Sequence, residues 1–212
     1  MTPMHLPWLT LLTLLPLLGA AVALLARPVA RGVALAAALG AVGMIAVIWH
    51  AFNPAQGGMQ FEQWAPWLPQ LGIYYHTGID GLGLLMLALT AAVTLMAIAA
   101  AWRRFATEPL FFALVLALQA GLFGTFTALN FAHWFIFWEL SLIPAFFLIR
   151  LWGGAGRSRA ATQFFLYTMV GSVALLLAFL LLYLGTGQFD FVALARLAHQ
   201  GQLEPLLAAH LH

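Results

Sequence analysis

Residues 131–144 read Phe-Ala-His-Trp-Phe-Ile-Phe-Trp-Glu-Leu-Ser-Leu-Ile-Pro, and they show what kind of chain this is. Apolar side chains fill most of the segment, as they do in a helix that crosses a membrane. Glu139 is the exception, because a carboxylate is costly within the hydrocarbon layer and is usually retained there for a function. We therefore take Glu139 as the first candidate functional residue.

The apolar character of this segment extends over the whole chain. Of the 212 residues, 64% are hydrophobic and 7% are charged, whereas about a quarter of the residues in a soluble domain are charged. The chain is therefore predicted to be an integral membrane protein. It has no Cys, which excludes disulfides, thiolate catalysis and thiolate-held iron–sulfur clusters. It also lacks Lys, so all eight residues of permanent positive charge are Arg, which keeps its proton.

Six apolar runs are each long enough to cross a membrane as a helix. They cover residues 4–25, 33–52, 79–101, 109–129, 131–151 and 160–184. We expect an all-α polytopic bundle of about six transmembrane helices, with the first helix retained and not removed as a signal peptide. The expected divisions are residues 1–52 with two helices, an outer loop at 53–78, residues 79–185 with four helices, and an outer segment at 186–212.

The arginines predict the orientation of these helices. Seven of them flank the loops on one side of the bundle, namely Arg27, Arg31, Arg103, Arg104, Arg150, Arg157 and Arg159. The opposite loops, 53–78 and the link at Asn130, contain no Arg. Because loops rich in Arg stay in the cytoplasm, we expect a multi-pass protein of the inner (cytoplasmic) membrane with its N-terminus outside.

The outer loop and the end of the chain carry interfacial signals. Aromatic residues gather in the loop, where they suit anchoring at the membrane surface and leave room for short strand pairing; they are Trp64, Trp67, Tyr74 and Tyr75. Asp80 is placed to cap the helix that follows. An amphipathic helix is expected shortly after the sixth span, and residues 204–212 resemble the approach to a further span.

Glu139 is followed by a second unusual residue, Pro144. A proline removes the hydrogen bond to the carbonyl of Leu140, so the helix is expected to kink or loosen there and to admit water or neighbouring side chains. A desolvated carboxyl can bind and release a proton near neutral pH. The alternative is a structural Glu139 that is hydrogen-bonded to a neighbouring helix.

Three more residues are candidates for proton transfer. Gln163 and Tyr167 lie four residues apart, so they share a helical face and could hold a file of water or bind another helix. His133 lies one turn into its span and could exchange protons, although an interfacial role is the alternative. The remaining histidines are scattered, so we expect no metal, haem or other cofactor site and no catalytic residue in this chain.

Several motifs resemble one membrane-protein family. They are Gly78-Ile-Asp-Gly-Leu, Phe137-Trp-Glu-Leu-Ser-Leu-Ile-Pro, Trp152-Gly-Gly and Arg159-Ala-Ala-Thr-Gln-Phe-Phe-Leu-Tyr-Thr-Met-Val-Gly-Ser. The chain resembles the antiporter-like M-type subunits of respiratory complex I, the proton-pumping NADH:quinone oxidoreductase. Related patterns occur in multisubunit cation/proton antiporters and membrane-bound hydrogenases.

The resemblance implies about fourteen spans in two inverted repeats, each with a broken helix. It also implies that a Glu on the fifth span, matched here by Glu139, pairs with a Lys on the seventh, and that charge changes at this pair move protons along a hydrated axis. Six spans correspond to the N-terminal half. We expect a fragment, a split protein whose seventh helix and Lys come from a separate chain, or a shortened protein with a changed role.

The leading hypothesis is a proton-translocating portion of a redox-driven complex, with Glu139, His133, Gln163 and Tyr167 on the proton path. The alternatives are a non-pumping structural or assembly subunit and a subunit of a cation/proton antiporter. The expected partners are other membrane subunits and lipid, not nucleic acid. NADH, flavin and iron–sulfur chemistry would belong to those other subunits.

Overall fold

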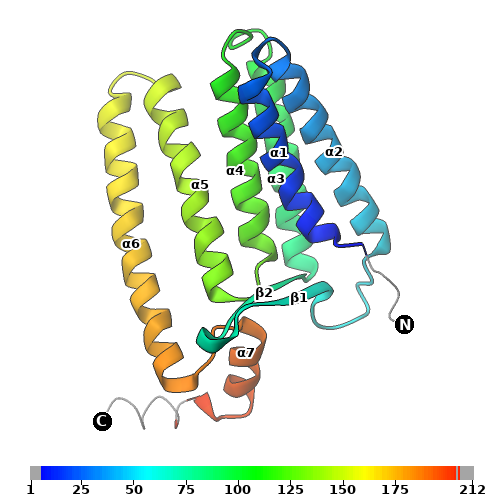
Figure 1. The fold of residues 1–212 in the computed structure, drawn as a ribbon, viewed down its shortest axis with the longest axis vertical. Coiled ribbons are helices and arrows are strands. Elements are labelled where there is room, and N and C mark those ends of the chain that lie inside the picture. The colour runs from blue at the N-terminus through cyan, green and yellow to red at the C-terminus, as the bar shows by residue number, and fades with distance from the viewer. Residues whose placement is uncertain (1–5, 204, 206–212) are drawn as a thin grey trace.

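Long helices standing side by side make up most of the molecule (Figure 1). The computed structural model describes residues 6–203 and 205. Its long helices are α1 (Trp8–Leu25), α2 (Ala30–Ala51), α3 (Gly81–Ala101), α4 (Pro109–Thr127), α5 (Phe131–Trp152) and α6 (Arg157–Thr186). All six are long and apolar enough to cross a membrane. The predicted polytopic helical bundle is confirmed, and residues 204 and 206–212, expected to approach a further span, lie outside the described part.

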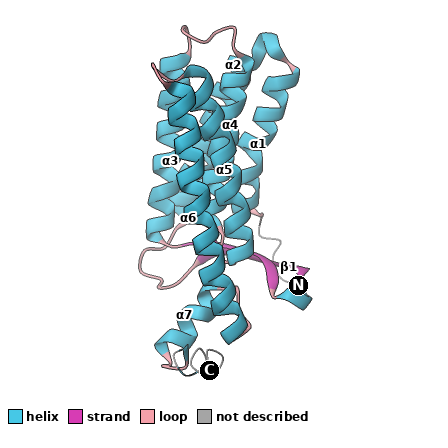
Figure 2. Ribbon diagram, turned by 90° about the vertical axis from the view of Figure 1, so that its left-hand side faces the viewer, coloured by secondary structure: helices cyan, strands magenta, loops and turns pink. Residues whose placement is uncertain are grey.

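A small two-stranded element closes one end of the bundle. Strands β1 (Gln60–Leu68) and β2 (Ile73–Ile79) pair antiparallel, so the strand pairing considered for this loop is present. The turn passes through Gly72 at φ +67°, a conformation that glycine adopts without steric cost. Helix α7 (Phe191–His199) lies at the same end, as the side view in Figure 2 shows. We call this end the hairpin end.

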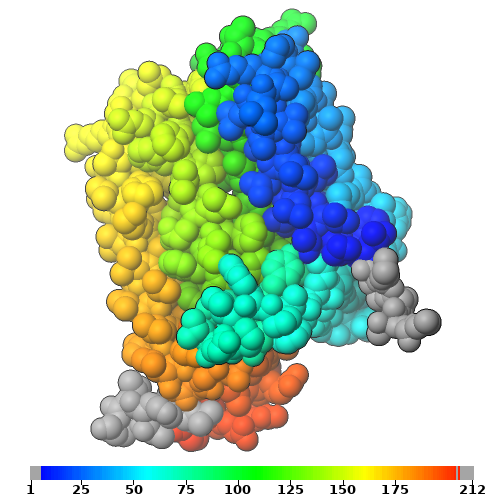
Figure 3. Space-filling model, in the orientation of Figure 1, coloured from blue at the N-terminus to red at the C-terminus, as the bar shows by residue number. Residues whose placement is uncertain are grey.

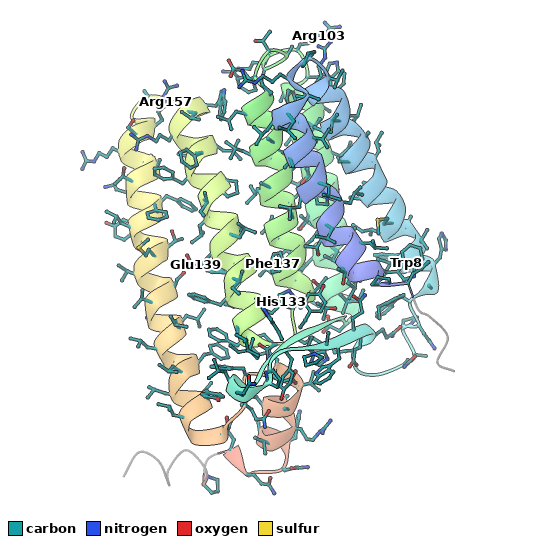
Figure 4. The ribbon with its side chains drawn as sticks, viewed as in Figure 1. Trp8, Arg103, His133, Phe137, Glu139 and Arg157 are labelled. Atoms are coloured by element: carbon teal, nitrogen blue, oxygen red, sulfur yellow. The ribbon has the colours of Figure 1, made fainter. Side chains whose placement is uncertain are left out.

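The other end of the bundle carries most of the arginines. Figure 4 shows Arg103 there, in the connection from α3 to α4, and Arg157 there, at the first position of α6. The short turn from α1 to α2 also lies at this end (Figure 1) and contains Arg27. The sequence pattern thus corresponds to a real segregation of positive charge, and we call this the arginine end.

Helix α4 is the centre of the packing. Its side chains Phe112, Leu116 and Phe123 are fully buried in the two apolar clusters that α1, α2 and α3 share with it. Its opposite face meets α5 through glycine. A Cβ placed on Gly121 would lie 2.9 Å from the Cβ of Ser141, so only glycine lets the two helices approach this closely.

Helices α5 and α6 form the more exposed side of the bundle. Along α6 the buried residues are Ala161, Ser172 and Gly185. Trp138 on α5 donates to the Ser172 hydroxyl over 3.3 Å, and the ring of Phe131 stacks on that of Phe179 with centroids 3.9 Å apart. In the space-filling view α5 and α6 form one flank of the molecule, and the hairpin covers the lower part of the face between this flank and the N-terminal side (Figure 3).

Hydrogen bonds join three segments at the hairpin end, namely strand β2, the connection from α4 to α5 and the connection from α6 to α7. The N–H of Leu129 donates to the carbonyl of His76 over 2.8 Å, and the N–H of Phe131 donates to the carbonyl of Phe189 over 2.7 Å. The side chain of Asn130 caps α5 by accepting from the N–H of Ala132, and its amide donates to the carbonyl of Gly72 over 3.2 Å. The start of α5 is therefore fixed both to the hairpin and to the connection before α7.

Candidate functional site

Glu139 lies about halfway along α5 (Figure 4). Its Oε1 atom is buried and has no hydrogen-bond partner in the protein. Arg150, which shares its helix, instead places its guanidinium over the ring of Phe146, 5.6 Å from the centroid. Within the described residues Glu139 forms no ion pair. The carboxyl is therefore enclosed by the protein on one side and not neutralised by it.

Pro144 is buried inside α5, which is one continuous helix on both sides of it. One turn before it, the hydroxyl of Ser141 donates to the carbonyl of Trp138 over 2.7 Å. This side-chain bond lies in the turn where the proline weakens the backbone ladder. A bend at Pro144 remains a prediction.

His133 is enclosed, with 3% of its surface exposed. Its ring lies against Tyr75 of β2 at 4.8 Å and against Phe137 at 5.0 Å between centroids. Its Nδ1 atom is buried with no partner. The residue therefore lies inside the bundle, under the hairpin, where its ring brings α5 into contact with β2.

Gln163 and Tyr167 take a different position. Both lie on the exposed face of α6, and Tyr167 is 75% exposed. Among the described residues they do not join His133 in one enclosed group. Two polar side chains facing outward from a membrane helix are costly in lipid, so this face suits contact with another helix.

The buried side-chain polar atoms that have no protein partner in the described structure belong to three neighbouring elements. They are Thr77 Oγ1, both amide atoms of Gln119, His133 Nδ1 and Glu139 Oε1. All of them lie on β2, α4 or α5. Buried polar groups are nearly always hydrogen-bonded, to ordered water where the protein offers no partner. This part of the bundle is therefore the region most suited to internal water.

A group of charged residues that the sequence analysis missed lies at the hairpin end. His76 contacts the carboxylate of Asp190 through Nδ1, and its Nε2 lies 3.3 Å from Oε2 of Glu62. Asp190 also caps α7 by accepting from the N–H of Ala193 over 2.9 Å. His76 and Asp190 are 114 positions apart in the chain, and no sequence pattern connects them.

The electrostatics of this group follow from its geometry. The hydrogen bond to Asp190 raises the pKa of His76, although burial acts in the opposite direction. Burial raises the pKa of Asp190, but hydrogen bonds from His76 and from the N–H of Ala193 outweigh it, so the net shift is downward. Both shifts act in the same sense, because each favours an imidazolium of His76 paired with a carboxylate of Asp190.

The described residues contain no group of three or more His, Asp or Glu side chains that is placed to hold a metal ion. Glu62 and Asp190 meet opposite nitrogens of the His76 ring, so the three side chains do not converge on a common point.

Comparison with known proteins gives consistent matches. Residues 128–211 match the family described as NADH:quinone oxidoreductase/Mrp antiporter, transmembrane. The chain is 41% identical over 181 residues to NAD(P)H-quinone oxidoreductase chain 4 2 of Thermosynechococcus vestitus, covering 81% of this chain and 33% of that protein. It is 38% identical over 175 residues to F420H2 dehydrogenase subunit M of Methanosarcina mazei, covering 81% of this chain and 35% of that protein.

The fold also matches a chain in the structure of respiratory complex I from Thermus thermophilus with bound NADH. The TM-score is 0.76 at 29% identity, and the match covers 95% of this chain and 39% of that chain. The sequence thus spans about a third of the length of the curated relatives that it matches.

Proposed function

We propose, on the premise that this chain belongs to the NADH:quinone oxidoreductase/Mrp antiporter family of transmembrane subunits, that it is the N-terminal portion of a proton-translocating subunit. In this role Glu139 binds and releases the proton in the middle of the membrane. The redox chemistry belongs to other subunits of an NADH:quinone oxidoreductase-type complex.

The observation that carries this proposal is the state of Glu139. A carboxyl atom that is buried halfway along a membrane helix, without a protein partner, can be satisfied by water or by a group from another helix. Either arrangement allows the carboxyl to gain and lose a proton, and a cation offered by another helix would favour its loss. The unpaired atoms of Gln119 on α4 and His133 on α5 supply further polar positions for an internal water chain.

The exposed face of α6 supports the inclusion of further helices. Gln163 and Tyr167 would face lipid if α6 had no neighbour on that side. We propose that a helix from a separate chain, or from another part of the same protein, packs on this face and offers a Lys to Glu139. This multi-pass protein would have its arginine end in the cytoplasm, in keeping with the positive-inside rule.

The decisive experiment replaces Glu139 by glutamine in the assembled complex, reconstituted in liposomes. Gln has the same shape but cannot ionise, so proton pumping per electron transferred should fall at least about tenfold. The matched control is Glu108→Gln, because Glu108 is exposed at the arginine end, where it precedes α4. Wild-type pumping by Glu139→Gln, with normal electron transfer, would show that Glu139 does not carry protons.

Cation/proton antiport is the second candidate, because the matching family also includes Mrp antiporters. The same reconstituted complex distinguishes the two functions. A sodium gradient that drives proton movement in liposomes without any electron donor supports antiport, whereas movement that needs the electron donor supports redox-driven pumping.

A further inference from the structure

The cluster of Glu62, His76 and Asp190 at the hairpin end has no role in the function proposed so far. The three side chains come from β1, β2 and the residue before α7. The side chain of His76 is almost fully buried, that of Asp190 is mostly buried, and that of Glu62 is half exposed. The cluster thus leads from the interior of the protein to its surface.

The contacts in the cluster favour one added proton. An ionised carboxylate only accepts hydrogen bonds, and a neutral imidazole has one N–H. The two contacts, one at each ring nitrogen, therefore need one hydrogen more than a neutral ring and two carboxylates provide. The extra proton lies either on the His76 ring or on a carboxyl group. Three groups that share one added proton form a proton-binding site.

The site is open to water. A polar pocket of about 370 Å³ adjoins it. The charged and titratable side chains that line this pocket or lie against His76 are Glu62, Tyr74, His133, Asp190 and Arg196. Arg196 is the single cation of permanent charge among them, and two carboxylates oppose it. The local field therefore favours an added proton.

The site also reaches inward. The ring of Tyr75, next to His76, packs against the ring of His133, and the Oγ1 of Thr77 is buried without a partner, as is Nδ1 of His133. The hydrogen bond from the N–H of Leu129 to the carbonyl of His76 fixes this part of β2 against the start of α5. Buried polar atoms that lack a protein partner, and that water could satisfy, thus continue from the cluster towards the interior of the bundle beside α5.

We propose that His76, together with Glu62 and Asp190, is the site at which protons pass between the interior of the bundle, beside α5, and water at the hairpin end. This inference rests on the proposed function, because it supplies the port that a proton carried by Glu139 would use. The raised pKa of His76, caused by its bond to Asp190, agrees with it. Protons would enter or leave by exchange at the ring nitrogens.

The test measures proton pumping by the reconstituted complex between about pH 6 and pH 9. His76→Gln should reduce pumping at least fivefold, because Gln cannot bind the proton. Asp190→Asn should move the alkaline limb of the pumping profile to lower pH by about one unit, because removal of the carboxylate lowers the pKa of His76. The control is His199→Gln, because His199 is exposed at the end of α7, outside the cluster.

Asp190→Asn keeps the test decisive if His76→Gln does not assemble, because Asn also caps a helix. An unchanged pH profile for an assembled Asp190→Asn complex overturns the port, as does full pumping by His76→Gln. Glu139→Gln separates the two proposals. If it pumps normally, the proposed function fails; if it stops pumping while Asp190→Asn keeps the wild-type profile, only the port fails.

Discussion

The contact between Gly121 of α4 and Ser141 of α5 allows a quantitative prediction. A Cβ on Gly121 would lie 2.9 Å from the Cβ of Ser141, 3.0 Å from its Cα and 3.1 Å from its backbone nitrogen. Carbon atoms in good contact are about 3.5–4.0 Å apart. Gly121→Ala therefore requires α5 to move by roughly 0.6–1.1 Å relative to α4. Two of the three atoms are backbone, so a change of rotamer does not relieve the clash.

Overpacking of this kind costs about 1–3 kcal/mol of unfolding free energy. Alanine also favours the helix over glycine by up to about 1 kcal/mol, which partly hides the cost. Gly43→Ala corrects for this gain, because Gly43 lies inside α2 and a Cβ added there would meet nothing within 4 Å. The difference between the two variants should then be about 1–3 kcal/mol, with Gly121→Ala the less stable.

The assay is denaturant-induced unfolding of the two variants in the same detergent, followed by circular dichroism and near-ultraviolet absorption. Equal unfolding free energies for Gly121→Ala and Gly43→Ala would refute the reasoning, because they would mean that α5 is free to shift without loss of packing. A lower stability for Gly43→Ala than for Gly121→Ala would refute it as well.

Two further predictions concern the hairpin end. Asn130→Ala should lower stability by about 1–3 kcal/mol, because it removes the cap of α5 and the bond that the fully buried Asn130 donates to Gly72; thermal unfolding measures this, and an unchanged midpoint contradicts it. Because the folded-state pKa of His76 is raised, its stabilisation is complete below its usual 6.5 and is lost as pH rises through the raised value. Hydrogen-exchange protection of β2 and α7, corrected for intrinsic rates, should therefore fall on the alkaline side, and Asp190→Asn should remove most of this pH dependence.

The sequence predicts the helices well because each one must be long and apolar to cross lipid, and this requirement is local. Asp80 was likewise identified as a cap from its place before α3, and its side chain does accept from the N–H of Gly83 over 2.7 Å. Such features depend on residues a few positions apart.

Features that depend on distant residues were out of reach. The contact of His76 with Asp190 joins a strand to the start of α7, and neither residue is unusual in its own segment. The burial of His133 was equally hidden, since it depends on Tyr75 of the hairpin packing over it. Whether a polar side chain faces the core or the exterior, as with Gln119 and Gln163, depends on which helices become neighbours.

The backbone bonds that join Leu129 to His76 and Phe131 to Phe189 have a mechanical consequence. They fix one end of α5 by backbone hydrogen bonds, whereas the other end meets its neighbours through ring packing, with Trp152 against Phe105 and Phe111. Small tilts of α5 would therefore pivot about its first turn. A helix of this length is about 33 Å long, so a tilt of about 3° displaces its far end by roughly 1.7 Å and leaves its first turn almost still. Any such rocking would be greatest near Trp152 and smallest beside the hairpin.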